Sequence, residues 1–229
     1  MEADARRRVG PVVLIPAYNP GAALPELVRR LSERFARIVI VDDGSVSGRD
    51  EIAVAARFAE KVLVHQENRG KGAALKTGLA YIGRADVVTA DSDGQHTCED
   101  IERVADALAG HGGGLVLGVR AFSGKVPFRS RFGNWWTRHF FRMLTGLDVA
   151  DTQTGLRGIP AALVERVAAL PGERYEFEMV MLADARNHPA PPLQVPIATV
   201  YIDGNRESHF SPLADTRRIY GALFRFLWK

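Results

Sequence analysis

The sequence predicts an α/β protein in which helices cover both faces of a mostly parallel sheet. Short runs rich in Val, Ile and Leu alternate with longer segments whose apolar residues recur at helical spacing, and this alternation is typical of βαβ units. The runs are almost continuously apolar, as expected for strands that are buried on both faces. Polar loops follow three of them, and sheets of this kind bind ligands at the carboxyl ends of their strands.

The first strand is expected at Val12–Ile15, where Pro16 closes an apolar run. A turn that contains Asn and Gly follows, and then a helix, because apolar residues recur at helical spacing between Leu24 and Phe35. The second strand, at residues 38–41, runs directly into two aspartates. The alternation then continues with helices at residues 50–60, 73–82 and 101–109 and strands at residues 62–65, 87–89 and 115–119.

The pattern changes after Val119. Residues 120–134 are basic and typical of a loop, and residues 135–145 form an aromatic segment with helical spacing. Further helices are expected at 160–169, 176–187 and about 213–228, and prolines from Pro189 to Pro196 lead into a strand at 198–202. No repeat or linker divides the chain. We expect a frayed segment at residues 1–10 and a single domain over residues 11–229.

Composition excludes several classes of protein. The 229 residues are 46% hydrophobic and 25% charged, as in ordinary globular domains, and no apolar run is long enough to cross a membrane. The N-terminus has arginines but no apolar segment behind them, so it is not a secretory signal. Cys98 is the only cysteine, which fits a reducing cytoplasm. A net charge of +3 is too small to indicate a nucleic acid partner.

The hexad Asp91–His96 follows an apolar strand and carries two carboxylates one residue apart. Oxygen ligands of this kind suit a hard divalent cation such as Mg²⁺ or Mn²⁺, which in turn suits phosphate oxygens. Gly94 allows a sharp turn behind the pair. A solvated acidic turn is the alternative for an isolated motif of this type.

Two other loops at strand ends carry polar chemistry. Asp42 and Asp43 are placed to accept hydrogen bonds from a base or ribose, although either one could instead cap the following turn. The glycine-rich segment Asn68–Gly72 precedes a helix and can present amides to an anion, or it can be a flexible turn. The histidines show no metal-ligand spacing with one another, and Gly-x-Ser-x-Gly is absent.

Basic residues follow the strand that ends at Val119. Arg120, Arg129 and Arg131 carry the planar fork of donors that suits phosphate, although solvated surface arginines are common. Aromatic residues follow them, which describes either a surface for phosphate and hydrocarbon or ordinary core packing. These aromatic residues are Trp135, Trp136, Phe140 and Phe141.

In order along the chain, these segments resemble the family-two glycosyltransferases with the GT-A (nucleotide-diphospho-sugar transferase) fold, above all the polyprenyl-phosphate, dolichol-phosphate mannosyltransferase-like branch. The resemblance covers about residues 11–220. Its motifs in the first half are Ile15–Asn19, Val41–Ser45, Asn68–Leu75 and Asp91–His96. Its motifs in the second half are Phe128–Asn134, Asp151–Gly158, Tyr175–Met179, Tyr201–Ile202 and Ser208–Phe210.

This resemblance implies that residues 11–119 bind a nucleoside-diphosphate sugar, with UDP or GDP as the nucleotide. The metal, Mg²⁺ or Mn²⁺, would bind at Asp91 and Asp93, with Gln95 as a further ligand. The residues implied in donor binding are Pro16, Ala17, Tyr18, Asn19, Asp42, Asp43, Lys71, Asp91, Ser92, Asp93 and Gln95.

The same resemblance implies that residues 120–229 bind a polyprenyl phosphate acceptor. Arg120, Arg129 and Arg131 would hold its phosphate, and a late loop with Arg206, Ser208 and His209 would close over the donor diphosphate. Catalytic roles fall on Asp93, Arg120 and Asp151. Asp151 is either a base or a residue that orients an acceptor-binding arginine, and Glu176 and Glu178 are the alternatives for a base.

The implied reaction is an inverting, metal-dependent transfer of a sugar at the cytoplasmic face of the cell membrane. Many relatives continue into transmembrane helices, whereas this chain ends at Lys229. Either a separate membrane protein is the partner, or the final helix touches the membrane surface, with core packing as the equal alternative for that helix. A transferase for soluble glycans or natural products, a nucleotidyltransferase and a binding module without turnover are the other functions considered.

Overall fold

The computed structural model describes residues 10–120, 128–198 and 212–228, and side chains within 128–136 and 212–217 are not described. Its centre is a seven-stranded sheet with the order β3-β2-β1-β4-β6-β5-β7. All of its pairings are parallel except the two that β6 makes with β4 and β5. The strands are β1 (Val12–Ala17), β2 (Ile38–Asp42), β3 (Lys61–Val64), β4 (Val87–Thr89), β5 (Val116–Arg120), β6 (Arg157–Ile159) and β7 (Leu193–Ile197).

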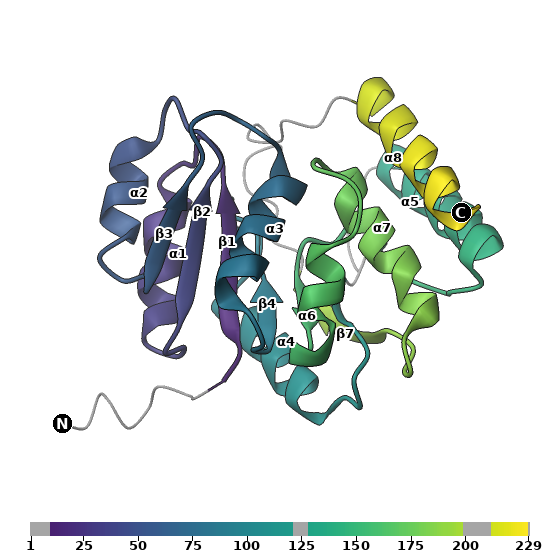
Figure 1. Cartoon of the computed structure of the whole chain (residues 1–229), viewed down its shortest axis with the longest axis horizontal. Helices are drawn as coiled ribbons and strands as arrows, with labels where there is room; N and C mark the ends of the chain where they lie inside the picture. The colour runs from purple at the N-terminus through teal and green to yellow at the C-terminus, as the bar shows by residue number, and fades with distance from the viewer. Residues whose placement is uncertain (1–9, 121–127, 199–211, 229) are drawn as a thin grey trace.

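Helices cover both faces of this sheet (Figure 1). One face packs against α1 (Ala23–Ser32), α2 (Arg49–Ala55) and α4 (Cys98–Gly110). The other packs against α3 (Lys71–Ile82), α6 (Ala161–Ala168) and α7 (Glu176–Asp184), which continues into the short 3₁₀ helix η2 (Ala185–Asn187). The expected α/β architecture with a mostly parallel, doubly covered sheet is therefore confirmed.

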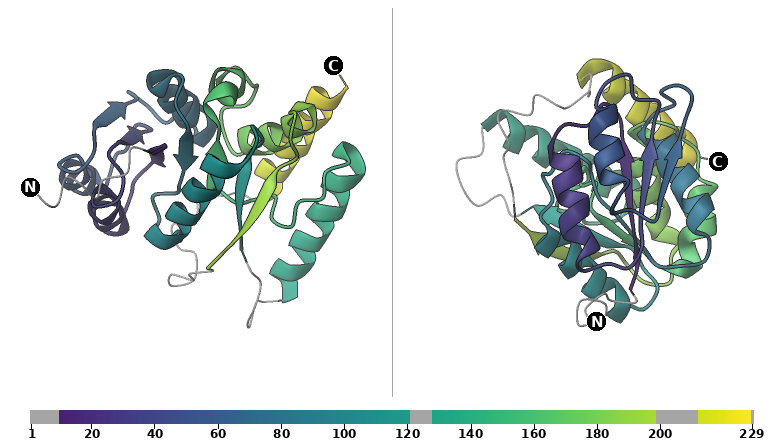
Figure 2. Two further views of the ribbon diagram at one scale, coloured as in Figure 1. Left: turned by 90° about the horizontal axis from the view of Figure 1, so that it is seen from below. Right: turned by 90° about the vertical axis from the view of Figure 1, so that its left-hand side faces the viewer.

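Two further helices, α5 (Phe128–Thr145) and α8 (Pro212–Leu227), lie at the end of the molecule away from α1 and α2 (Figures 1 and 2). A third core cluster joins them to α7 and β5, and Phe141 and Leu223 are its fully buried members from α5 and α8. Phe141 is thus core, whereas Phe140 stacks edge-on against Tyr220 with ring centroids 5.0 Å apart.

Several expected elements differ from the observed ones. A strand lies at Leu193–Ile197, where a connection rich in proline was expected. Apart from residue 198, the strand expected at 198–202 lies outside the described residues. Pro196 lies inside the observed strand, which is possible because β7 is at the edge of the sheet and has a neighbour, β5, on one side. The helix expected at 135–145 begins earlier, at Phe128, and β6 was not expected at all.

The first strand also extends beyond its expected end. β1 reaches Ala17 and contains Pro16, although β1 is central in the sheet. Pairing between β1 and β4 stops at Leu14, whose carbonyl accepts a bond from the amide of Ala90. Nitrogens of residues i and i+2 in a strand face the same neighbour. The missing N–H of Pro16 therefore faces the side where β4 has already ended, and no ladder bond is lost.

One edge of the sheet gathers the carboxyl ends of the parallel strands. Ala17 pairs with Asp42, and Leu14 pairs with Thr89, which directly precedes the acidic loop. β5 ends at Arg120, while antiparallel β6 begins at Arg157 opposite Thr89. The predicted polar loops after β2 and β4 and the arginine at the end of β5 therefore meet at the same edge.

Gly78 lets α3 pack directly on β1. A Cβ atom at this position would lie 2.2 Å from Leu14 Cδ1, inside a buried contact. We expect Gly78→Ala to lower the free energy of unfolding by about 1–3 kcal/mol, because overpacking outweighs the helix propensity of alanine. Gly221 in α8 is the matched control, since open space surrounds its Cβ position. Urea denaturation should show that Gly221→Ala stabilises by up to about 1 kcal/mol, and equal effects at both positions would contradict this packing.

Asp184 at the end of α7 is a buried carboxylate with several donors. Arg166 Nη2 lies 2.6 Å from its Oδ1, and Asn187 and His188 also contact it. Although burial raises the pKa of Asp184, these partners lower it to about 2. A lowered pKa in the folded state means that this stabilisation is present above about pH 4 and is lost as the pH falls towards 2.

Replacing Asp184 should therefore change the acid sensitivity of the fold. We expect the difference in free energy of unfolding between the parent protein and Asp184→Asn to narrow by about 1 kcal/mol between pH 7 and pH 3. Urea denaturation at the two pH values measures it. Asp148→Asn is the control, because Asp148 forms an exposed pair with Arg138. A difference for Asp184→Asn that stays constant with pH would contradict the assignment.

Candidate active site

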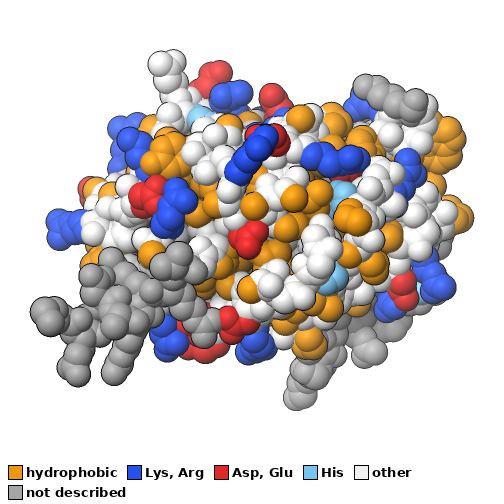
Figure 3. All heavy atoms as spheres, turned by 60° about the horizontal axis from the view of Figure 1, so that its bottom comes forward, with side chains coloured by type: hydrophobic (Ala, Val, Ile, Leu, Met, Phe, Trp, Pro, Cys, Tyr) orange, Lys and Arg blue, Asp and Glu red, His pale blue; other side chains and the backbone are white. Residues whose placement is uncertain are grey.

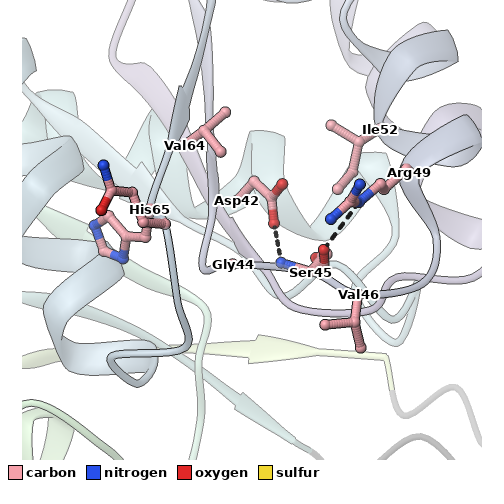
Figure 4. Close-up of a pocket in the computed structure, with 9 residues that line it drawn as sticks. Asp42, Gly44, Ser45, Val46, Arg49, Ile52, Val64 and His65 are labelled. Atoms are coloured by element: carbon pink, nitrogen blue, oxygen red, sulfur yellow. Dashed lines mark hydrogen bonds between the residues drawn. The ribbon is translucent and has the colours of Figure 1, made fainter.

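A pocket of about 290 Å³ opens at the ends of β2 and β3 (Figure 4). Asp42 and Ile52 point into it together with the guanidinium of Arg49, which donates to the carbonyl of Ser45 at 3.2 Å. The carboxylate of Asp42 accepts one bond, from the amide of Ser45 at 2.9 Å. The alternative that Asp42 caps a turn is thus observed, and the same side chain also lines the pocket.

Asp43 faces away from this pocket and organises the next loop. Its carboxylate accepts hydrogen bonds from the amides of Arg69 and Gly70 at 2.9 and 2.7 Å, and it lies 2.7 Å from Nδ1 of His65. The other ring nitrogen of His65 contacts Thr77 on α3. Because Asp43 is buried and makes all three contacts, its observed role is to fix the glycine-rich loop at the start of α3.

The loop after β1 is tied to the loop after β2. Asn19 donates its amide to the hydroxyl of Ser45, and its side-chain oxygen accepts the amides of Val46 and Ser47. Its φ of +50° is the unusual left-handed conformation that asparagine tolerates. Pro16 and Ala17 are buried in β1, whereas Tyr18, the next residue, is partly exposed at the same strand end.

The acidic loop contains two carboxylates in different environments. Asp91 Oδ1 lies 2.6 Å from the ammonium of Lys71, the first residue of α3, and Asp91 Oδ2 lies 3.4 Å from Nε2 of buried His96. Burial alone would raise the pKa of Asp91, but Lys71 and His96 hold it well below its ordinary value. Burial and then the charge of Asp91 raise the pKa of Asp93. Asp91 is therefore firmly ionised, whereas Asp93 has no cationic partner of its own within the part of the chain that the structure describes.

These residues fit a divalent cation that is shared with a phosphate ligand. Mg²⁺ and similar ions are usually held by one or two carboxylates plus phosphate oxygens and water. Asp91 and Asp93 would supply the carboxylates, and the amide of Gln95 donates to Asp93 Oδ1 at 2.9 Å, which orients that side chain. The described residues contain no cluster of three or more acidic, histidine or cysteine side chains suited to hold a metal without such a ligand.

The turn Asp151–Gly155 connects the acidic loop with Arg120. Arg120 binds the fully buried carboxylate of Asp151 through two nitrogens, at 2.6 and 3.1 Å. At the other end of the turn, a Cβ atom on Gly155 would lie 2.3 Å from Asp91 Oδ2, and the carbonyl of Gly155 accepts from Thr89. Of the two roles considered for Asp151, its geometry matches the orientation of Arg120.

The remaining residues of the predicted acceptor site are described only in part. Arg129 and Arg131 belong to the first turn of α5, and their side chains are not among those described. The predicted lid residues Arg206, Ser208 and His209 lie outside the described residues. The arginine cluster and the lid therefore stay predictions, with Arg120 as the member whose surroundings are known.

Two residues at the site make contacts that the sequence did not indicate. Glu178, one of the alternatives for a base, is mostly buried and lies 3.0 Å from the ammonium of Lys71. Arg157 in β6 is buried and donates to the carbonyls of Thr154 and Glu178. Burial lowers the pKa of Arg157. Arg157 opens a three-residue strand and is followed by Gly158, so the sequence has no periodic pattern that indicates this contact.

Comparison with known proteins identifies the family. Residues 12–170 match the model of the family described as glycosyl transferase family 2. A UDP-N-acetylglucosamine–dolichyl-phosphate N-acetylglucosaminyltransferase of Methanococcus voltae is 30% identical over 215 residues, 83% of this chain and 86% of that protein. The polyprenol monophosphomannose synthase of Mycolicibacterium smegmatis is 29% identical over 203 residues, 81% of this chain and 76% of that protein.

Solved structures agree on the fold. The glucosyl-3-phosphoglycerate synthase of Mycobacterium tuberculosis, solved with Mn²⁺, UDP and glucosyl-3-phosphoglycerate, superposes with a TM-score of 0.72. It covers 99% of this chain and 82% of that one at 20% identity. The GT-A fold that the resemblance implied is thereby confirmed, as is the likeness to the polyprenyl-phosphate branch through the named relatives. The chain belongs to glycosyl transferase family 2, and it is a glycosyltransferase.

Proposed function

We propose that this glycosyltransferase moves a sugar, with inversion, from a nucleoside-diphosphate sugar to a polyprenyl phosphate. The observation that carries the proposal is the turn Asp151–Gly155, which contacts the acidic loop at Gly155 and binds Arg120 at Asp151. A cation-binding loop for a diphosphate and an arginine suited to a phosphate are thus linked by five residues at one edge of the sheet.

The nucleotide base is assigned to the pocket beside Asp42. One carboxylate oxygen of Asp42 accepts from Ser45, so the other can accept an N–H of a base, and Arg49 supplies donors nearby. Tyr18 and the backbone of Pro16 and Ala17 border the neighbouring strand end. Asp43 contributes indirectly, because it fixes the loop in which Lys71 lies.

The diphosphate and its cation are assigned to the loop that carries Asp91, Ser92 and Asp93. A bound Mg²⁺ or Mn²⁺ would stabilise the negative charge that develops on the departing nucleoside diphosphate. Asp91 enters this site already ionised, and Gln95 orients Asp93 through its amide. The choice between the two metals is open to measurement.

The acceptor phosphate is assigned to Arg120, with Arg129 and Arg131 as further cations. An oxygen of the acceptor phosphate forms the new bond to the anomeric carbon while the bond from that carbon to the diphosphate breaks, and the electron pair leaves with the nucleoside diphosphate. A phosphate monoester is largely ionised near pH 7, so it needs alignment rather than a general base. Asp151 supplies that alignment by holding the guanidinium of Arg120.

A lipid acceptor requires access to a membrane surface. No helix among the described residues is both long and apolar enough to span a bilayer. The end of the molecule formed by α5 and α8 exposes Phe224 (42%) and Trp228 (68%), whose rings stack 5.0 Å apart, together with Met143. Hydrophobic and basic side chains lie together at this end (Figure 3). We assign this end to peripheral contact with the cytoplasmic face of the membrane.

The second candidate acceptor is a small soluble phosphate ester. The M. tuberculosis structure that shares this fold holds glucosyl-3-phosphoglycerate, whose acceptor part is such an ester. The lipid acceptor is preferred because the curated relatives at 29–30% identity are named for dolichyl or polyprenol phosphates. Both acceptors carry a phosphate, but only the lipid attaches it to a long hydrocarbon chain, so direct assays separate them.

A transfer assay tests the proposal. The protein is incubated with single UDP- or GDP-sugars, Mn²⁺ or Mg²⁺, and undecaprenyl phosphate in detergent, and products are separated by chromatography and identified by mass spectrometry. We expect a monoglycosylated lipid phosphate and one equivalent of nucleoside diphosphate. Asp93→Asn should lower the rate by about 100-fold or more, because the developing charge loses its stabilisation.

Asp106→Asn, on the exposed face of α4, is the matched control and should retain the parent rate. Transfer to 3-phosphoglycerate without glycolipid formation would replace the lipid acceptor with the soluble one. A soluble glycan acceptor predicts that Arg129→Ala and Arg131→Ala leave activity intact. Absence of any product with all donors, or full activity of Asp93→Asn, would refute the proposal.

Membrane contact is tested separately, by sedimentation with vesicles. Removing the two stacked aromatic side chains in Phe224→Ser/Trp228→Ser should weaken binding to anionic vesicles by about tenfold or more, since each large apolar side chain contributes about 1.5–3 kcal/mol when it is buried. Phe58→Ser is the control, because Phe58 is similarly exposed (38%) just after α2, at the opposite end of the molecule. Equal vesicle binding by the parent protein and the double variant would exclude this end as the contact surface.

A further inference from the structure

Lys71 lies between two carboxylates that come from distant parts of the chain. Its ammonium is 2.6 Å from Asp91 Oδ1 on the acidic loop and 3.0 Å from Glu178 Oε2 in the first turn of α7. All three side chains are mostly buried, and α3 packs beside α7 at this point (Figure 1). An ammonium has three donors, so it can bind both carboxylates at once or either one alone.

The close approach of these elements is built into the backbone. A Cβ atom on Gly72 would lie 2.6 Å from Phe177 Cβ, so glycine lets the start of α3 reach the start of α7. Gly155 makes the equivalent approach to Asp91. The carbonyl of Glu178 is also held, because Arg157 donates to it. The backbone of Glu178 is therefore held in place, whereas Lys71 has a flexible side chain whose ammonium can shift between its two partners.

A divalent cation on Asp91 would compete with Lys71 for the same carboxylate. Two cations within a few ångströms repel each other strongly in a partly buried site. Lys71 can then leave Asp91 only if its own charge stays compensated, because an unpaired buried charge is unfavourable. Glu178 is placed to provide that compensation, since it already contacts the ammonium.

We infer that Lys71 occupies the cation position at Asp91 until the metal binds, and that Glu178 then retains Lys71. Glu178 is thus a positioning residue for metal entry, and a base role for it is not required. This inference rests on the proposed function, because it takes Asp91 as a metal ligand. It gives α7, through Glu178, a part in the metal site, although α7 supplies no ligand to the metal.

The two residues should have opposite effects on metal affinity. In Glu178→Gln, Lys71 has Asp91 as its one charged partner and holds it more firmly, so Mn²⁺ should bind about tenfold more weakly, as for other residues that support metal ligands. In Lys71→Met, Asp91 has no competing ammonium, so Mn²⁺ should bind more tightly than to the parent protein. In the double variant Lys71→Met/Glu178→Gln, loss of Glu178 should have no further effect on Mn²⁺ affinity.

Titration of Mn²⁺ in the presence of UDP or GDP, against a blank of nucleotide alone and followed by the electron paramagnetic resonance signal of the free ion, measures these affinities. Thermal unfolding establishes that each variant is folded, and Glu165→Gln, in the exposed pair with Arg84, is the control for removal of a glutamate charge. Parent affinity in Glu178→Gln, weaker binding by Lys71→Met, or an undiminished effect of Glu178→Gln in the double variant would each overturn the inference.

The same titration distinguishes failure of the proposed metal site from failure of the proposed exchange of Lys71. If the parent protein fails to bind Mn²⁺ in the presence of nucleotide, the assignment of the metal to Asp91 and Asp93 is wrong, and the inference is overturned with it. If the parent protein binds Mn²⁺ and the variants bind equally well, the proposed metal site stands and the exchange of Lys71 is wrong.

Discussion

The ion pair between Lys71 and Asp91 is the interaction on which the arrangement of the site depends. Asp91, Asp93 and Glu178 place three carboxylates near one another at the same edge of the sheet. Two like unit charges 4 Å apart repel by about 4 kcal/mol at the effective dielectric constant typical of such sites. Lys71 offsets part of that repulsion. It also joins three elements that are far apart in sequence: the start of α3, the loop after β4 and the first turn of α7.

Several other features of the fold serve that pair. Asp43 binds the amides of Arg69 and Gly70 directly before Lys71, so the lysine starts from a fixed backbone. Gly155 brings the turn after α5 against Asp91, where any side chain would displace the carboxylate. At the other end of the same turn, Asp151 fixes Arg120. The donor side and the acceptor side are therefore positioned by one set of loops, and a shift in the acidic loop would reach Arg120 through five residues.

The sequence predicted the first half of the chain well because buried parallel strands are continuous apolar runs and the loops after them carry distinctive residues. Asp42, Asp91 and Asp93 fall at strand ends as expected. The sequence did not predict features that depend on contacts between distant parts of the chain. β6 has three residues, one of them Arg157, so no periodicity reveals it. The carbonyls of Thr154 and Glu178 accept from Nε and Nη1 of Arg157, and the nearby carboxylates of Glu178, Asp151 and Asp91 favour its charge. Pro196 was expected in the connection before a strand, but the edge position of β7 allows it to lie inside that strand. Glu178 gave no local sign that Lys71 would bind it across more than a hundred residues.

The burial of Asp151 bears on which acceptors the site can use. A sugar or alcohol hydroxyl must lose a proton to become a good nucleophile, and a carboxylate with free lone pairs normally takes it. At this edge Asp151 accepts hydrogen bonds from Nε and Nη2 of Arg120, while Asp91 and Glu178 both contact the ammonium of Lys71. Of the carboxylates around Lys71 and Arg120, Asp93 is the one with no cation within ion-pair distance among the described residues, and it is proposed as the second metal ligand. An acceptor that is already an anion removes the need for a base, and it also supplies the negative charge that the guanidinium of Arg120 can bind. The electrostatics of the described residues thus favour a phosphate acceptor over a hydroxyl acceptor, independently of the names of the relatives.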